Sequence, residues 1–581
     1  MISAISTNII SPLGFTTEEN YQAVLSGRSA LRRYDEYPPL KGGCVKVEPF
    51  AASLFSEEQR AALALDGYTF FEAIAIRSAR EALAQTSLDA SSPRVVLLLS
   101  TTKGDIGAYP SDAAQRIAKA LGVSTTPIVV CNACVSGLSA QLLADYLLSA
   151  DLYDYAIVVG AEVQSKFIVA GFQSLKAVSD EPCRPFDIER TGLNLGEAAA
   201  TIIFKGQTPS NSPLKGEKQS STVNSLPLRE GWGASGGLAG AWYLIAAAAR
   251  NDAFHIVSPS PQGDGCYKAI EAVMAGRDKS QLATVCVHGT ATLFNDQMES
   301  KAIERAGLTD IPLSALKGYY GHTMGVAGVL ETILTMRATD DGLVLPSKGF
   351  TELGVSGKVS ISSKSRRSSK TSFLKLLSGF GGCNVAALFS RGKGQGARNK
   401  SRSLIKKHTI SLSSKDGKSL TDIYKQEVGD YPKFYKMDIL TRLAFLAAEL
   451  LKKESLPIEG EAWKGSPLIL FNHSSSIVSD RQFLTTISDD NLFPSPSVFV
   501  YTLPNITAGE VAIRHHINCE TSFYILPKRD EALMQQILEA TLSATGATSA
   551  LSGWVDAKSE TSFECELSIY EMNNEEVATA L

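Results

Sequence analysis

The hydrophobic pattern of the first 205 residues alternates between short apolar runs and longer amphipathic ones. Four apolar runs have the length and the β-branched composition of buried strands, and they cover 94–100, 127–131, 155–163 and 199–204. Residues 69–85, before the first run, and residues 137–149, between the second and the third, carry apolar side chains at helical spacing. Strands without a polar face need cover on both sides, so the pattern predicts an α/β fold with a sheet between helices.

The same alternation returns after a polar segment over 206–236 that is rich in Pro, Ser and Gly and is predicted to be a surface insertion. Further strands are expected within 254–258, 283–290, 373–382 and 384–390, and further helices within 266–276 and 326–338. Two βα-rich halves, 1–205 and 237–392, therefore flank the insertion.

A third region, 411–581, follows a basic, Gly/Ser-rich stretch over 393–410 that reads as a linker. Its elements repeat the order of the first half. A helix over 437–454 matches 69–85, and a strand within 466–475 matches 93–101.

The segment 497–517 is interpreted as strand, turn and helix, and is aligned with the stretch around Cys134. The strands expected within 547–557 and 563–572 complete the repeat. On this alignment the counterpart of Cys134 is Ile506 or Thr507, and no cysteine lies there. We therefore predict a non-catalytic α/β domain that resembles one half of the preceding unit.

Composition and net charge limit the classes of function that the chain can have. The chain has 581 residues, 44% of them hydrophobic, and a net charge of −4, which provides no overall basic field for nucleic acid. Nine cysteines are scattered along the chain, several of them in apolar strand-like runs, as expected for reduced thiols in a cytoplasmic protein. The N-terminus lacks the features of a signal peptide. No apolar run reaches the ~18 residues of a membrane span.

Cys134 lies where an apolar strand gives way to a helix, in "VVCNACVSGLSAQLL". A lone cysteine is more often a core residue than a nucleophile. Here, however, small neighbours leave room for a substrate, and a strand-to-helix turn points a side chain outward. The start of a helix also favours a thiolate, so a lowered pKa is expected. Cys131, inside the strand, is predicted to be core.

Two histidines and a glycine-rich turn follow in the second half. His288 ends an apolar strand in "VHGTATLFND", and His322 follows Lys317 by five residues in "KGYYGHTMGVAGVLE". Phe380 lies between glycines in "SGFGGCN". Each segment alone is a weak signal, because an isolated histidine is more often structural and glycine-rich turns are common.

In this order, the four segments resemble the β-ketoacyl-acyl carrier protein synthases of the thiolase superfamily. "CRPFDIERTGLNLGEAAA" (183–200) and "NDAFHIVSPSPQGDG" (251–265) resemble two further signatures of that family. The resemblance covers residues 1 to about 392 without the insertion. It implies a thiolase-like fold, with duplicated βαβαβαββ halves layered α-β-α-β-α, and a homodimer that pairs sheet edges across a two-fold axis.

The resemblance also implies a Cys-His-His active site. Cys134 would carry the acyl chain, while His288 and His322 would donate hydrogen bonds to a malonyl thioester and Lys317 would orient its neighbours electrostatically. The N–H groups of Cys134 and Phe380 would form the oxyanion hole, and Phe380 would gate the acyl chain. The residues expected to contact substrate are Thr290, Thr292, Gly381 and Gly382. Those expected to support the histidine loops are Asp296, Glu299 and Glu331.

The implied reaction is a decarboxylative Claisen condensation of an acyl thioester with malonyl-acyl carrier protein, in fatty acid, polyketide or aryl-polyene type biosynthesis. The acyl carrier protein is the implied partner, and a local Lys/Arg patch near the pocket should receive it. No metal or free cofactor is implied. The third region would pack on the synthase or shape its pocket, by analogy with chain-length factors.

Two departures from the family pattern keep alternatives open. Asn132 and Val135 replace the residues usual beside the nucleophile, which affects rate and substrate preference more than reaction type. Cys383 replaces a usual threonine and raises the possibility of a thiolase, whose second cysteine acts as a base. The synthase-like histidine segments argue against it. The other alternative is a non-catalytic assembly subunit of the chain-length-factor type.

Overall fold

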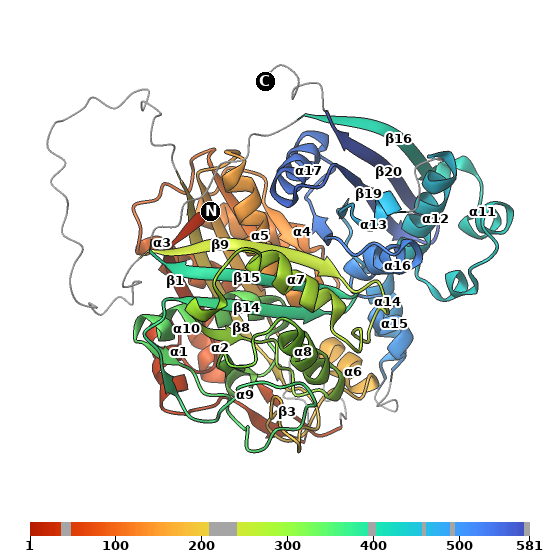
Figure 1. The fold of residues 1–581 in the computed structure, drawn as a ribbon. Coiled ribbons are helices and arrows are strands. Elements are labelled where there is room, and N and C mark those ends of the chain that lie inside the picture. Colours follow the sequence, from red (N-terminus) through yellow and green to blue (C-terminus); the bar gives the residue numbers. More distant parts are fainter. Residues whose placement is uncertain (36–47, 208–240, 393–402, 456–460, 489–493, 574–581) are drawn as a thin grey trace, which may run out of the picture.

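The computed structural model describes residues 1–35, 48–207, 241–392, 403–455, 461–488 and 494–573 (Figure 1). The predicted insertion over 206–236 lies almost wholly outside these ranges. The predicted linker over 393–410 lies partly outside them, and its last residues belong to a strand that begins at Leu404.

The first unit is built on five strands in the order β1-β8-β6-β4-β5. The strands are β1 (Ile2–Ile10), β4 (Val95–Ser100), β5 (Ile128–Val130), β6 (Tyr155–Glu162) and β8 (Ala198–Gly206). The helices are α1 (Thr17–Leu25), α2 (Glu57–Leu63), α3 (Phe70–Ala84), α4 (Pro110–Leu121), α5 (Ser136–Ser149) and α6 (Lys166–Ser174). A small separate sheet joins β2 (Arg32–Tyr34), β3 (Phe50–Ser53) and β7 (Leu195–Gly196).

Local sequence explains these elements. Every residue of β4 is buried, as its unbroken apolar run predicted. Helix α3 begins after Thr69, whose side chain accepts the N–H of Glu72 while the Glu72 carboxylate accepts the N–H of Thr69, a capping box. The four strands and two helices predicted for this half are confirmed.

The second unit repeats the order as β9-β15-β14-β10-β11. Its strands are β9 (Trp242–Asn251), β10 (Leu282–Cys286), β11 (Leu313–Ser314), β14 (Ser372–Gly379) and β15 (Cys383–Arg391). Its helices are α7 (Asp264–Met274), α8 (Leu293–Arg305), α9 (Lys317–Tyr320) and α10 (Ala327–Asp340). A two-stranded ribbon joins β12 (Leu343–Val344) and β13 (Arg366–Arg367).

One strand of this unit was predicted in the wrong place. Residues 254–258 form no strand; the His255 ring nitrogen Nδ1 accepts the backbone N–H groups of Val257 and Ser258 and folds the segment into a turn. The strand is β9, whose alanine-rich sequence carries a weak β signal.

The third unit has the order β16-β20-β19-β17-β18. Its strands are β16 (Leu404–Ser413), β17 (Leu468–Asn472), β18 (Thr521–Ile525), β19 (Ser549–Ser559) and β20 (Ser562–Met572). Its helices are α11 (Leu420–Glu427), α12 (Ile439–Glu454), α13 (Glu461–Lys464), α14 (Ile477–Thr486), α15 (Pro496–Val500), α16 (Asn505–His515) and α17 (Glu531–Thr545). Its antiparallel and parallel pairings match those of β1-β8-β6-β4-β5. The predicted half-like domain is therefore present.

The predicted alignment of 497–517 is wrong by one strand–helix step. Residues 496–500 are helical because Pro496 occupies the first turn and Ser495 caps it. The strand that matches β5 is β18, and α17 matches α5. Cys134 lies four residues beyond β5, and the position four residues beyond β18 is Arg529, not Ile506 or Thr507.

Strand β18 pairs antiparallel with β5 and joins all three units into one 15-stranded sheet. Tyr524 lies opposite Val130, and the Cys131 N–H donates to the Phe523 carbonyl at 3.2 Å. In the expected homodimer, sheet edges of two chains would pair with each other. Here the β5 edge is already paired with β18 of the same chain. Homodimerisation stays a prediction and would need another surface.

Helices α5, α10 and α17 form a central layer. Helix α5 packs on α10 and on α17, and apolar side chains of all three belong to one continuous core with the inner faces of the strands. This layer carries the starts of α5 and α10 to the same place between the units, where the chemistry-bearing residues meet.

Candidate active site

A tight turn between β5 and α5 presents Cys134. Ala133 adopts a left-handed φ of 48°, and the Ser136 hydroxyl donates to the Ala133 carbonyl at 2.6 Å and accepts the Asn132 N–H at 2.9 Å. Cys134 is 9% exposed and lines a cavity of about 400 Å³. The turn therefore does what the sequence predicted, because it aims the thiol at an accessible space.

An equivalent turn precedes α10 and positions His322. Met324 has a φ of 43°, close to that of Ala133 before α5. The Met324 N–H donates to Nδ1 of His322 at 3.2 Å, so the ring hydrogen of the neutral imidazole lies on Nε2. Nε2 is buried without a protein partner, and His322 lines the cavity. This ring can therefore donate a hydrogen bond to a ligand.

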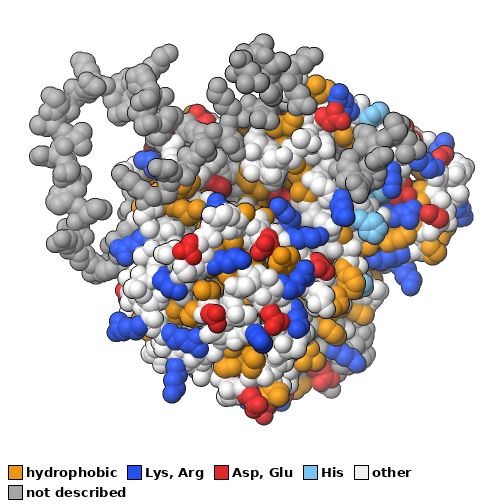
Figure 2. All heavy atoms as spheres, viewed as in Figure 1, with side chains coloured by type: hydrophobic (Ala, Val, Ile, Leu, Met, Phe, Trp, Pro, Cys, Tyr) orange, Lys and Arg blue, Asp and Glu red, His pale blue; other side chains and the backbone are white. Residues whose placement is uncertain are grey.

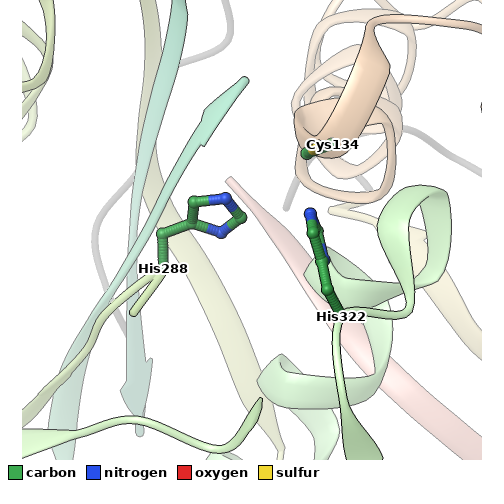
Figure 3. Close-up of side chains that lie close together, drawn as sticks. All are labelled: Cys134, His288 and His322. Carbon is green, nitrogen blue, oxygen red and sulfur yellow. The ribbon is translucent and has the colours of Figure 1, made fainter. Parts of the chain in front are cut away.

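His288 follows β10 and faces both residues. The N–H groups of His288 and Gly289 donate to the Glu299 carboxylate at 2.6 and 2.9 Å, which fixes the loop. The His288 and His322 rings meet edge to face with centroids 5.1 Å apart. Figure 3 shows these two rings and Cys134 converging, and one side-chain ligand atom from each lies within 4.8 Å of the others.

A buried cluster of two lysines and a glutamate supports the His288 backbone. Lys317 Nζ donates to the His288 carbonyl at 2.6 Å and to Glu331 at 2.8 Å. Lys375 Nζ donates to the second Glu331 oxygen at 2.5 Å and to the Val287 carbonyl at 3.3 Å. Lys317 thus acts on the histidine loop. Lys375 was not predicted, although a lysine within the apolar run "FLKLL" is a signal of burial.

Burial and positive charge keep both histidines neutral. Burial, followed by the charge on Lys317, holds the pKa of His288 and of His322 well below the usual range. Although burial opposes it, the charges of Lys317 and Lys375 hold the pKa of Glu331 below its usual value. At neutral pH the site therefore presents uncharged imidazoles beside a negative carboxylate that compensates the lysines.

The expected lowering of the Cys134 pKa is wrong. Burial raises the pKa of this thiol to about 12, and the charge on Lys317 only partly opposes the shift. The cost of removing a thiolate from water outweighs the favourable start of α5. The thiol is therefore neutral before substrate binds and has to lose its proton during acyl transfer, with the His288 imidazole as the acceptor within reach, because the free nitrogen of His322 already carries a hydrogen.

This raised pKa predicts how alkylation of Cys134 depends on pH. Only the thiolate reacts, and the thiolate fraction grows as pH rises toward the pKa, so the rate with iodoacetamide should increase about tenfold per pH unit between about pH 7 and pH 9. The measurement is mass spectrometry of the peptide that contains Cys134. A rate that levels off below about pH 8 would contradict the prediction, since it would require a lowered pKa.

The glycine-rich turn lies against the nucleophile. A β-carbon placed on Gly379 would lie 3.3 Å from the Cys134 backbone nitrogen, so this turn is as near to the Cys134 N–H as the predicted oxyanion hole requires. Phe380 lines the large cavity and also a second, small cavity of about 10 Å³. Its ring stacks on Phe172 at 6.2 Å. Phe380 therefore separates two spaces that both reach Cys134.

Of the four residues expected to contact substrate, three line the large cavity. Thr290, Thr292 and Gly382 line the large cavity, with the two threonine hydroxyls 2.9 Å apart. Gly381 is not among the lining residues; its φ is 88°, and an added β-carbon would lie 2.8 Å from Nδ2 of Asn505. Cys383 does not line the cavity either, and its sulfur lies 3.4 Å from the Thr521 hydroxyl.

The mouth of the cavity is more apolar than predicted. Leu293 and Phe294 line it with 59% and 74% of their surface exposed, and Lys176 is the one Lys or Arg among the lining residues in the described ranges. Figure 2 shows basic side chains spread over the displayed face between acidic and apolar ones. The predicted Lys/Arg patch at the mouth is thus represented by a single lysine there.

Cys134, His288 and His322 are also the residues, among those described, whose donor atoms lie close enough together to hold a metal ion. The thiol and the imidazoles point into the substrate cavity, so such an ion would compete with substrate for the site. The absence of a metal cofactor stays a prediction.

Two family models match the parts of the chain that build this site. Residues 2–209 match the β-ketoacyl synthase N-terminal domain, and residues 243–351 match the β-ketoacyl synthase C-terminal domain. The chain belongs to the β-ketoacyl synthase family. The ketosynthase resemblance that the sequence motifs suggested is confirmed. The third unit lies beyond both matches.

Curated relatives are named 3-oxoacyl-[acyl-carrier-protein] synthase 2. That of Mycobacterium leprae is 30% identical over 276 residues, which is 45% of this chain and 60% of the relative. That of Vibrio cholerae is 27% identical over 440 residues, or 66% of this chain and 97% of the relative. The chain thus spans about three fifths of the first relative and nearly all of the second.

Among solved structures, the chain is similar to "PfaC Keto synthase-Chain length factor". The match has a TM-score of 0.75 and 13% identity, and covers 99% of this chain and 78% of that one. At this identity the likeness shows the fold, which is thiolase-like as predicted, and it extends through the third unit. In the ranges that the structure describes, no helix combines the length and apolarity that crossing a bilayer needs.

Proposed function

We propose that the protein is a 3-oxoacyl-[acyl-carrier-protein] synthase that condenses an acyl thioester with malonyl-acyl carrier protein. The convergence of the Cys134 thiol with two neutral imidazoles at the bottom of one cavity supports the proposal. The thiol attacks the acyl thioester, and the carrier thiol leaves with a proton. The N–H groups of Cys134 and Phe380 stabilise the tetrahedral oxyanion.

The second half-reaction begins when malonyl thioester enters. Loss of carbon dioxide leaves the electron pair of the broken bond as an enolate, and hydrogen bonds from His288 and His322 to the thioester oxygen stabilise that charge. The enolate carbon then attacks the acyl group on Cys134, and the thiolate leaves as the product's new carbon–carbon bond forms. Neutral donors suit this step, because they need not lose a proton.

Retention of the nucleophile argues against a purely structural subunit. The first two units keep Cys134, His288 and His322 together, whereas the matching position of the third unit is occupied by Arg529. We therefore assign catalysis to the first two units and a chain-length-factor type role to the third. The fold match to a keto synthase paired with a chain length factor supports this division.

The third unit helps to enclose the acyl side of the nucleophile. Phe499, Thr502 and Leu503 line the small cavity beyond Phe380. Lys103 lines it from the first unit, and its Nζ donates to the Ser476 hydroxyl at 3.0 Å and forms an ion pair with Asp480. Lys103 therefore places a buried charged group on the cavity wall, which disfavours long apolar chains.

Replacing Phe499 with alanine should admit longer acyl primers. The ring fills space beside Gly171, where an added β-carbon would lie 2.1 Å from it. For a primer two methylenes longer than the preferred one, kcat/KM relative to the preferred primer should rise at least about tenfold. Phe483→Ala is the matched control, because its ring packs on Phe499 but does not line the cavity. An equal change in both variants would argue against a wall formed by Phe499.

The proposed partner is an acyl carrier protein that delivers both substrates on its thiol-bearing arm. Its approach would cross the rim formed by Leu293, Phe294 and Lys176, which combines apolar contact with one positive charge. We place the enzyme in the cytoplasm, since the eight cysteines within the described ranges are all free.

The test is reconstitution with an acyl carrier protein loaded with acetyl or acyl primers and with malonate. The expected result is an acyl adduct on Cys134, followed by carbon dioxide release and a product two carbons longer. Condensation from acetyl rather than malonyl thioester would instead indicate thiolase chemistry. An unmodified Cys134 with every primer would favour the assembly-subunit alternative.

A further inference from the structure

The third unit is hydrogen-bonded directly to the glycine-rich turn that carries Phe380. Nδ2 of Asn505, at the start of α16, donates to the Phe380 carbonyl at 2.8 Å. The helix approaches so closely that a β-carbon on Gly509 would lie 2.8 Å from the Gly381 carbonyl oxygen. A residue outside both family matches therefore touches the backbone of the phenylalanine that divides the two cavities.

Two further bonds surround this contact from the synthase side. The Gly381 N–H donates to the Ile256 carbonyl at 2.7 Å, and Nδ2 of Asn251 donates to the Gly381 carbonyl at 2.8 Å. Asn251 also donates to the Thr521 hydroxyl of β18 at 2.9 Å. The turn is thus held at successive peptides, with the third unit contributing the bond at Phe380 itself.

We propose that Asn505 is a positioning residue that latches the acyl gate in its closed position. Gly381 and Gly382, at φ values of 88° and 74°, can change conformation without side-chain clashes and form the hinge of the turn. Movement of Phe380 toward the large cavity would carry its carbonyl away from Asn505. Opening therefore breaks this hydrogen bond, and acyl chains enter the small cavity only at that cost.

The environment of Asn505 makes the bond selective for the closed state. Asn505 is 1% exposed, and its Oδ1 is buried without a hydrogen-bond partner, so the amide is held by its donor side. Nδ2 also lies 3.8 Å from the Cys383 sulfur, a weak acceptor. When Phe380 moves, the buried Asn505 amide loses its acceptor and cannot reach water instead. The free-energy cost of this unpaired donor favours return of the gate to the closed position.

This proposal rests on the proposed function for its biological meaning, but its test does not need condensation. Cys134 lines both cavities, so iodoacetamide can reach the thiol through the large cavity, whereas the tail of N-decyl iodoacetamide can also enter the small cavity only when the gate opens. The ratio of the two alkylation rates therefore reports gate opening even in a protein that accepts no acyl thioester.

The variants are Asn505→Ala and Asn505→Leu in the full chain, with Thr507→Ala as the matched control. Leucine keeps most of the side-chain volume but removes the donor. Thr507 lies on the same helix, is equally buried, and shares its hydrogen bond with Thr441 rather than with the turn. Thermal unfolding of all three checks that any difference does not reflect loss of structure.

In both Asn505 variants the ratio of decyl to unsubstituted alkylation rates should rise about fivefold, the factor that one neutral hydrogen bond contributes to a two-state equilibrium. Thr507→Ala should leave the ratio at the wild-type value. An unchanged ratio in Asn505→Leu, or an equal rise in Thr507→Ala, would overturn the latch. Failure to form an acyl adduct in the wild type would overturn the proposed function alone.

Discussion

Cys134→Ala should abolish acyl transfer, with condensation reduced at least about a thousandfold. The thiol is the group that forms the covalent acyl intermediate, and alanine leaves the surrounding turn intact because the bonds of Ser136 to Asn132 and Ala133 do not involve the sulfur. The measurements are the mass of the protein after incubation with acyl-carrier protein and the rate of product formation.

Cys131→Ala is the matched control for this change. Cys131 lies three residues before Cys134 on the same segment, and its fully buried sulfur contacts the Thr102 carbonyl at 3.3 Å. Cys131 does not line either cavity. Its acyl adduct and rate should therefore stay close to those of the wild type. Loss of the adduct in both variants would mean that the segment, not the Cys134 thiol, is what the reaction requires.

His322→Ala and His288→Ala should each reduce release of carbon dioxide from malonyl thioester by about a hundredfold to a thousandfold, the usual effect of removing a donor aimed at developing charge. Acylation of Cys134 should be affected less, since the backbone oxyanion hole remains. The two steps are separated by measuring the adduct and labelled carbon dioxide in the same reaction.

His516→Asn serves as the control histidine variant. This side chain is exposed at the end of α16, with a φ of 55° that asparagine tolerates. Carbon dioxide release should stay at the wild-type rate. If His288→Ala and His322→Ala also release carbon dioxide at that rate, the donors of the decarboxylation step lie elsewhere.

The cluster of Cys134, His288 and His322 was predictable because each residue lies in a local sequence motif. Cys134 and His322 each lie in a turn that precedes a long helix, α5 or α10, and Ala133 and Met324 in these turns have matching positive φ values. Lys375 was missed because its role comes from Glu331, which lies far along the chain. The pKa of Cys134 was predicted in the wrong direction, since the helix start is visible in sequence and the degree of burial is not.

The third unit shows the limit of pattern alignment. Its strand order was predicted to repeat the first half, but "SVFVY" carries a strand-like composition that Ser495 and Pro496 override by starting a helix. Because of this error the alignment was shifted, and β18, which pairs with β5, was not predicted as a strand. Asn132, which is expected to affect rate and substrate preference, also accepts the Phe523 N–H of β18 at 2.7 Å, a contact that the sequence did not predict.

The junction between Asn132 and Phe523 has a consequence for how the enzyme behaves on dilution. A separate chain-length factor would dissociate as its concentration falls, whereas a tethered strand re-docks at a rate independent of the number of molecules in solution. Specific activity should therefore stay constant from micromolar to picomolar enzyme. Each 62.1 kDa molecule should bind a single acyl group and could not exchange its neighbour for one with another size preference.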